Sequence, residues 1–272
     1  MENNYSHLGS VYLQKGDFEI AIQFYEKSLA IKEKLGDIHG MAKTYGNLGT
    51  IYAKKGDYER ALQFFEKSLA NFEKLKDIQG MAKNYGNLGS IYYRQGDYER
   101  AIQLYDKSLG ITRKLKNIQE MAQTYNNLGL VYVRKGDFKQ SIQFYQRSLE
   151  IKEKLGDSQG MAKTYNNLGT VYLQKGDFEK ALQFYKKDLA ILEKLEDSQG
   201  MAQTQGNLGI LYKEQGRLGE AENLLLKAYE IFTKLGMMPD AMTAYGALQD
   251  LITKYRKRGD EERAKNVEIA IG

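Results

Sequence analysis

The chain has 272 residues, of which 42% are hydrophobic and 28% charged, and its net charge is +5. It contains no cysteine, which excludes disulfides, thiolate metal ligands and cysteine nucleophiles. No apolar run approaches the roughly 20 residues of a membrane-spanning helix. The first residues lack the basic and apolar regions of a signal peptide, so we expect none, and we expect a cytoplasmic protein.

One segment of about 40 residues recurs along the chain. It begins at Met41, returns almost unchanged at Met81, Met121 and Met161, and drifts at Met201. Such an array builds its core along one axis rather than around a centre, so residues 1–272 are predicted to form a single solenoid. The single proline in the chain favours nearly uninterrupted helix.

Residues 1–40 are predicted to be a truncated first repeat. Tyr5, Leu8, Gly9 and Tyr12 match the later copies, but the chain begins inside the first helix of the repeat. Natural arrays usually begin with a polar cap. We therefore expect either a piece of a longer protein or a first helix pair that frays, and we favour the first.

Residues 41–80 are a regular repeat and are predicted to form two antiparallel helices. Apolar residues recur in steps of three and four over 37–55, and again over the longer helix 58–75. Asp37 and Asp57 precede these helices as N-caps, and Gly56 can end the first in a left-handed conformation. Small residues are expected at the helix crossings and large residues between them. The small residues are Gly49, Ala61 and Ser68; the large ones are Tyr45, Leu48, Tyr52 and Phe65.

The second helix of each repeat is predicted to end at a left-handed residue. Gly36 and Gly156 suit that position, whereas Lys76, Lys116 and Glu196 replace the glycine, so we expect those three joints to be strained or closed differently.

Residues 81–120, 121–160 and 161–200 repeat this pattern, and residues 201–240 diverge from it. Gln205 replaces the aromatic residue, and Arg217 replaces the capping aspartate. Pro239 then suits a helix start. Residues 241–272 are predicted to be C-terminal capping helices, over 241–258 and 261–271.

The set Tyr45, Leu48, Gly49, Tyr52, Ala61 and Phe65 resembles the tetratricopeptide repeat, and it recurs in five full copies. The chain departs from that family in its longer second helix, its lack of an inter-repeat proline, and a serine at the usual late alanine, which is Asp188 in one copy. The longer repeat resembles that of Pins/LGN-type adaptors and of prokaryotic regulatory proteins. The resemblance implies an all-α, right-handed superhelical solenoid that binds protein segments in its concave groove.

No catalytic or metal constellation is found, so we predict no enzyme, no metal and no cofactor. His7 and His39 lack partners at metal-ligand spacing. The repeated Gly-Asp pairs lack the alternating acidic ligands of a calcium loop, and N-capping explains each aspartate more simply.

The concave face of the first helices is the candidate binding groove. One asparagine per full repeat can hold the backbone of an extended peptide, since an amide both donates and accepts; alternatively, it ties neighbouring repeats together. Basic residues lie one turn earlier and two turns later. Apolar positions of the groove that we expect to be exposed could form pockets for partner side chains or pack between repeats; they are Tyr93, Leu130, Val133, Leu173 and Ile210. The candidate groove residues are Asn47, Asn87, Asn127, Asn167, Asn207, Lys43, Lys83, Lys163, Lys54, Arg94 and Arg134.

A basic groove lined by amides predicts a protein or peptide partner that is acidic or ends in a carboxylate. We therefore predict a non-enzymatic protein-interaction scaffold, with neither membrane nor nucleic acid as partner. The alternatives are a self-associating structural array, joined through its uncapped N-terminal end, and the sensor arm of a larger multidomain regulator.

Overall fold

The computed structural model describes residues 2–272, and fourteen α-helices account for most of them. Contacts between residues divide the chain into two compact units, Met1–Asp137 and Phe138–Gly272. The helices of the first unit are α1 (Glu2–Lys15), α2 (Phe18–Leu35), α3 (Ile38–Lys54), α4 (Tyr58–Leu75), α5 (Ile78–Gln95), α6 (Tyr98–Lys114) and α7 (Ile118–Arg134). Those of the second are α8 (Phe138–Leu155), α9 (Ser158–Gln174), α10 (Phe178–Lys194), α11 (Ser198–Glu214), α12 (Leu218–Lys234), α13 (Met238–Lys257) and α14 (Glu261–Ile271).

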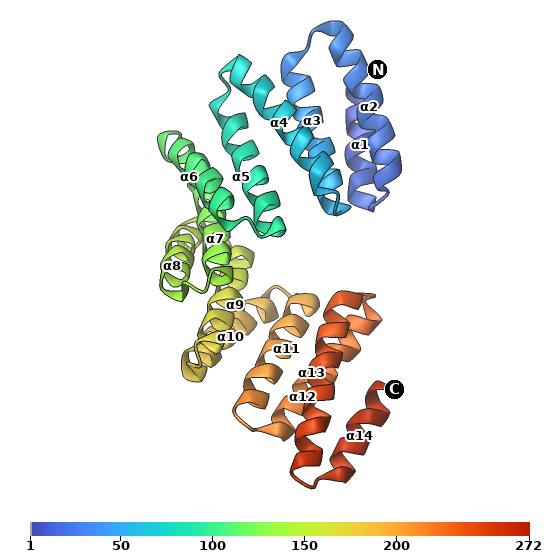
Figure 1. The fold of residues 1–272 in the computed structure, drawn as a ribbon, viewed down its shortest axis with the longest axis vertical. Helices are drawn as coiled ribbons and strands as arrows, with labels where there is room; N and C mark the ends of the chain where they lie inside the picture. The colour runs from blue at the N-terminus through green and yellow to red at the C-terminus, as the bar shows by residue number, and fades with distance from the viewer. Residues whose placement is uncertain (1) are drawn as a thin grey trace. The chain divides into compact units, whose positions relative to one another are not determined.

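Within each unit, successive helices run antiparallel and pack as pairs (Figure 1). Within a unit, each odd-numbered helix contacts the even-numbered helix that follows it, and each even-numbered helix contacts the odd-numbered helix after it. The predicted all-α solenoid of antiparallel helix pairs is therefore confirmed. The continuity of the array over residues 1–272, its truncated first repeat and its C-terminal cap remain predictions.

Aspartates start most of these helices, as predicted. The Asp37 carboxylate accepts from the Gly40 backbone N–H at 2.9 Å, and Asp57 accepts from the Arg60 N–H at 3.1 Å. Each bond satisfies a backbone donor that the first turn would otherwise leave unpaired. The same bond recurs at Asp77, Asp97, Asp157, Asp177 and Asp197.

The core lies between small residues of one helix and large residues of its partner. Leu48 and Ile51 of α3 pack with Tyr25 of α2 in one cluster. The next cluster joins Phe65 of α4 to α5, where Leu88 and Ile91 cover it. Each helix pair thus depends on the next repeat to bury its apolar stripe, as nearest-neighbour stacking requires.

Three second helices end at a left-handed residue other than glycine. The φ angles are 54° at Lys76, 53° at Lys116 and 54° at Glu196, whereas Gly36 and Gly156 take this conformation in other repeats. An L-residue in this region costs about 1–2 kcal/mol because its Cβ crowds the following carbonyl oxygen. The strained joints predicted from the sequence are therefore confirmed.

Replacing Lys76, Lys116 and Glu196 together with glycine should stabilise the protein. Each change removes the left-handed penalty but adds about 0.5–1 kcal/mol of unfolded-chain entropy, which leaves a net gain of roughly 0.5 kcal/mol per site. Urea unfolding followed by circular dichroism would measure it. Gln215→Gly is the control. Gln215 ends α11 at φ −74°, where no left-handed penalty exists, so this variant should be less stable than the wild type. A triple variant no more stable than the wild type would contradict the prediction.

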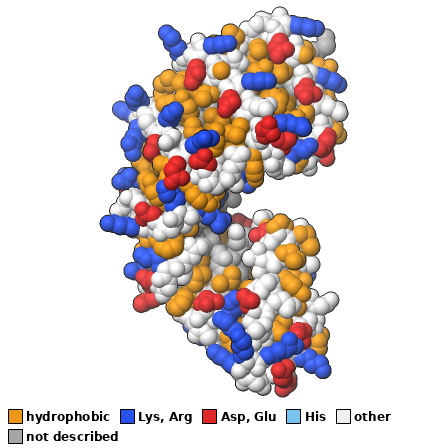
Figure 2. Space-filling model, in the orientation of Figure 1, with side chains coloured by type: hydrophobic (Ala, Val, Ile, Leu, Met, Phe, Trp, Pro, Cys, Tyr) orange, Lys and Arg blue, Asp and Glu red, His pale blue; other side chains and the backbone are white. Residues whose placement is uncertain are grey.

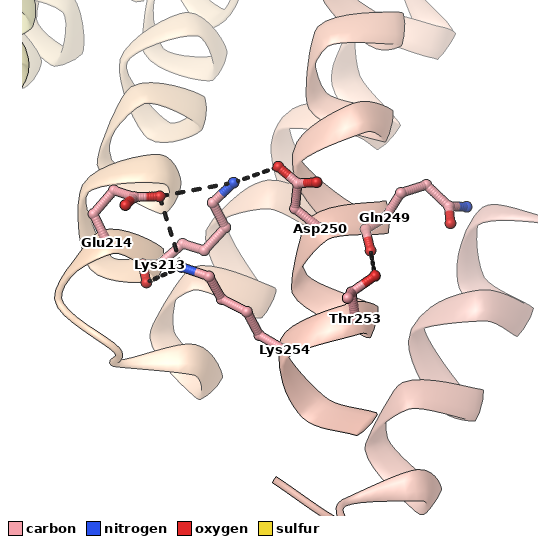
Figure 3. A network of polar contacts seen from close by, with 6 residues as sticks. All are labelled: Lys213, Glu214, Gln249, Asp250, Thr253 and Lys254. Carbon is pink, nitrogen blue, oxygen red and sulfur yellow. Dashed lines mark hydrogen bonds and ion pairs between the residues drawn. The ribbon is translucent and has the colours of Figure 1, made fainter. Parts of the chain in front are cut away.

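The last helices depart from the regular pattern. Helix α13 begins at Met238, three residues before the predicted start, with Pro239 in its first turn. Lys213 of α11 is buried, and its Nζ lies 3.0 Å from an oxygen of Asp250 on α13 (Figure 3). The Lys254 Nζ donates to the Lys213 carbonyl oxygen at 3.1 Å, and Glu214 completes the network. These contacts join α11 to α13 directly.

Candidate functional site

The structure places the predicted groove residues on the first helices of their repeats, as expected. The asparagines are half-buried, and the basic residues one turn earlier and two turns later are exposed. Their helices are α3, α5 and α7 in the first unit, and α9 and α11 in the second. Positive and negative side chains are interspersed over the face drawn in Figure 2.

The asparagines of this row differ in their contacts. Within residues 2–272, the side-chain amides of Asn47 and Asn87 make no hydrogen bond to another residue. The Asn127 Oδ1 accepts from Gln123 Nε2 at 3.3 Å, within the same helix. Asn207 donates to the Asn166 Oδ1 at 3.1 Å and so joins α11 to α9. The tie between repeats, one of the two interpretations of the row, therefore occurs at Asn207. Contact of these amides with a peptide backbone remains a prediction.

In the first unit, three predicted residues meet at one pocket of about 380 Å³ between α3, α4 and α5. Lys54 comes from the last turn of α3, and Asn87 and Arg94 come from α5. Among the described residues, no carboxylate lies within ion-pair distance of Lys54 or Arg94. The full lining is Thr50, Ala53, Lys54, Gly56, Tyr58, Phe65, Asn87, Ser90, Ile91 and Arg94, with two cations and no acid.

Two further basic residues of the first unit have partners. The Arg134 Nε lies 3.4 Å from the Tyr93 hydroxyl and links α7 to α5. Burial raises the pKa of the Glu120 carboxyl, and the charge of Lys83 opposes that rise. Lys83 therefore faces some negative charge from its own unit, and Lys54 and Arg94 are the stronger candidates for an acidic ligand.

In the second unit, Lys163 and Asn167 line a pocket of about 370 Å³ between α9, α10 and α11. Two acids, Asp188 and Asp197, line the same pocket, so its charge differs from that of the first. Sequence reasoning noticed that Asp188 breaks the serine pattern but gave it no role. A smaller pocket of about 110 Å³ includes Asn207.

The apolar groove positions are less exposed than expected. Tyr93, Leu130, Val133, Leu173 and Ile210 are each half-buried, so each buries part of its surface between helices and leaves the rest accessible. Ile210 lines the small pocket with Asn207. Both interpretations of these side chains, packing and ligand contact, are compatible with this partial burial.

The family of the chain follows from its match to a family model. The model of the tetratricopeptide repeat matches residues 1–74, 80–154, 120–194 and 160–234. The chain belongs to the tetratricopeptide repeat family. Tetratricopeptide repeat proteins are in general non-enzymatic scaffolds that bind protein partners. Within residues 2–272, no helix is both long and apolar enough to cross a membrane.

Solved tetratricopeptide-like structures share this fold at low identity. Aspartyl phosphate phosphatase F from Bacillus subtilis aligns with a TM-score of 0.78 and 15% identity, over 98% of this chain and 68% of its own. A signal transduction ATPase with a tetratricopeptide repeat sensor, from Pyrococcus horikoshii, aligns with a TM-score of 0.77 and 19% identity. The alignment covers 98% of this chain and 40% of the ATPase. BtubC from P. vanneervenii has a TM-score of 0.70 and 24% identity, over 80% and 92%. A comparison with curated protein sequences found no match.

Proposed function

We propose that this tetratricopeptide array is a non-enzymatic scaffold that binds an acidic, extended protein segment along the first helices of its repeats. One observation carries the proposal. The pocket between α3, α4 and α5 holds Lys54 and Arg94 with no acidic residue in its lining. Two unpaired cations at one concave site attract carboxylates, because each charge is left without a partner from the protein itself.

The other groups of this pocket suit a peptide. The Asn87 amide offers both a donor and an acceptor to a peptide backbone, since it has no partner within residues 2–272. The Thr50 and Ser90 hydroxyls donate to their own helices, to Gly46 O at 2.9 Å and Gly86 O at 3.0 Å, so they are less available. Ile91 adds an apolar surface for a partner side chain. We extend the proposal to Asn47, which has an equally open amide.

The array also suits the sensor arm of a larger regulator. The repeat region of the Pyrococcus horikoshii ATPase is described as a sensor, and this chain covers 40% of that protein. Binding of an acidic segment by the array is compatible with either a scaffold or a sensor role. A cytoplasmic location remains a prediction from the sequence, with which the absence of cysteine is compatible.

Peptide-display selection against the purified chain tests the proposal directly. We expect enrichment of sequences with clustered Asp or Glu, or with an essential C-terminal carboxylate. The selected peptide should bind Lys54→Ala/Arg94→Ala about tenfold more weakly, which corresponds to 1.4 kcal/mol. Asn87→Ala should weaken binding about fivefold, because one net hydrogen bond contributes roughly 1 kcal/mol. Fluorescence anisotropy would give each dissociation constant.

Lys74→Ala/Lys114→Ala is the matched control. It removes the same charge from exposed positions on α4 and α6, outside the pocket, and should leave affinity nearly unchanged. If selection yields no acidic consensus, or if the pocket and control variants bind equally, the groove assignment is wrong. Light scattering over a concentration series would then test self-association.

A further inference from the structure

The pocket between α9, α10 and α11 contains a buried acid that the earlier repeats lack. Asp188 of α10 lines this pocket with only 1% of its surface exposed. Its register position holds a serine in the earlier repeats, Ser28, Ser68 and Ser108. Asn166 stands opposite it, and the corresponding residues of the earlier repeats are Gly46, Gly86 and Asn126. Asp188 is therefore the residue that sets this pocket apart from the earlier repeats.

Asp188 and Asn166 are in direct contact. The Asn166 Nδ2 donates to the Asp188 Oδ2 at 2.9 Å, and the Thr204 hydroxyl of α11 donates to the same oxygen. The other carboxylate oxygen, Oδ1, accepts no hydrogen bond from any residue of the described chain. This oxygen is not fully buried, so it is accessible from the pocket. One acceptor of a nearly inaccessible acid at a pocket thus remains open.

Among the described residues, no cation forms an ion pair with Asp188. Lys163 lines the same pocket but forms no ion pair with Asp188, and its side chain is exposed. A second acid, Asp197, also lines the pocket, although one of its oxygens caps α11 by accepting from the Gly200 N–H at 2.8 Å. Burial raises the pKa of the Asp188 carboxyl, the Thr204 and Asn166 hydrogen bonds oppose that rise, and Asp197 adds to it. A bound cation would relieve both the burial and the repulsion.

We infer that this pocket binds a basic side chain of the partner segment, with an arginine guanidinium donating to the Asp188 Oδ1. A guanidinium is favoured over an ammonium because its planar set of five donors can reach several acceptors at once. The pocket supplies these from the Asp188 carboxylate and the side-chain amide of Gln203. This inference rests on the proposed peptide-binding function and adds a requirement for a basic residue in the ligand.

The test uses a small probe, N-acetyl-arginine amide, and the intact chain. Leu192 lines the pocket, so its methyl resonances report binding. We expect them to shift saturably with the arginine probe, less with N-acetyl-lysine amide, and not with the uncharged citrulline analogue. The Ile91 methyl, in the first-unit pocket, should not move.

The decisive variant is Asp188→Ser, which restores the residue of the earlier repeats and should fold. It should weaken probe binding at least tenfold, and Asp188→Asn should do the same if the serine variant is destabilised. An unchanged Leu192 titration in both variants, or none in the wild type, would overturn the inference and leave Asp188 with a structural role only. Acidic-peptide binding at Lys54 and Arg94 is measured separately, so either result can fail without the other.

Discussion

Gly169→Val should destabilise the second unit by about 3 kcal/mol, the upper end of the usual range for overpacking a core. A Cβ at Gly169 of α9 would lie 2.6 Å from two ring carbons of Tyr185 on α10, closer than real contacts allow. The Tyr185 ring cannot easily move away, since it is fully buried and its hydroxyl lies 3.2 Å from the Thr170 hydroxyl oxygen. The helices themselves would have to separate.

The matched control is Gly246→Val. Gly246 lies inside α13 of the same unit, is exposed, and a Cβ there would have no atom within 4 Å. We expect this change to alter stability by less than about 0.5 kcal/mol, because valine is the somewhat better helix former. Urea unfolding gives the two values, and amide exchange should localise the loss to α9, α10 and their neighbours. Equal effects of the two changes would show that the close helix crossing does not determine stability.

The close helix crossing at Gly169 could be predicted from the sequence, because a small residue faces a large one at the same position of successive repeats. The sequence places a glycine opposite an aromatic residue in successive repeats, and the structure places Gly49 against Phe65 and Gly89 against Tyr105. Helix bounds were predictable for the same reason. Asp57 and Leu75 bracket a pattern of apolar residues at helical spacing, and α4 spans residues 58–75 as predicted.

The contacts of the candidate site were less predictable, because they depend on which neighbour each side chain meets. The asparagine row looks uniform in sequence, yet Asn87 is open at a cationic pocket whereas Asn207 is bonded to Asn166. The partner residue lies about 40 positions away and differs between repeats. Comparison of the repeats does single out Asp188, since serine occupies its register position in the earlier repeats, but its contact with Asn166 comes from the structure.

The divergent repeat reverses the charge of the candidate groove. Lys54, Arg94 and Arg134 share one register position, and Glu214 occupies it in α11. The neighbouring Lys213 is buried and paired with Asp250, so its charge is not available to a ligand (Figure 3). The cationic character that favours an acidic ligand therefore does not extend to α11.

One buried lysine leads to the second prediction. Lys152 of α8 is only 4% exposed, and its Nζ donates to the Thr164 hydroxyl at 2.8 Å and to the Gly160 carbonyl oxygen at 3.1 Å. Burial lowers the pKa of the Lys152 ammonium to about 8 from its usual value of 10.5; Asp157 opposes this shift, and Lys163 adds to it. Periodicity alone places this position inward whatever residue occupies it, and Phe72 and Leu192 stand there in other repeats.

Lys152→Met should therefore stabilise the protein at pH 7, by an amount that falls as the pH rises. Because the folded-state pKa lies below the unfolded one, the unfolded chain binds more protons between about pH 8 and 10.5, and wild-type stability rises through that window. Methionine abolishes this effect. The difference in unfolding free energy between variant and wild type should shrink by roughly 2 kcal/mol from pH 7 to pH 9.5.

The methionine variant should leave no polar group of this site unpaired, since the Thr164 hydroxyl already donates to the Gly160 carbonyl oxygen at 2.9 Å. Urea unfolding at a series of pH values gives the difference directly. Lys154→Met, at an exposed position two residues along α8, removes the same charge and should show a difference that stays constant with pH. If the Lys152 difference is equally constant, the ammonium reaches water in solution, and the buried position of its side chain is wrong.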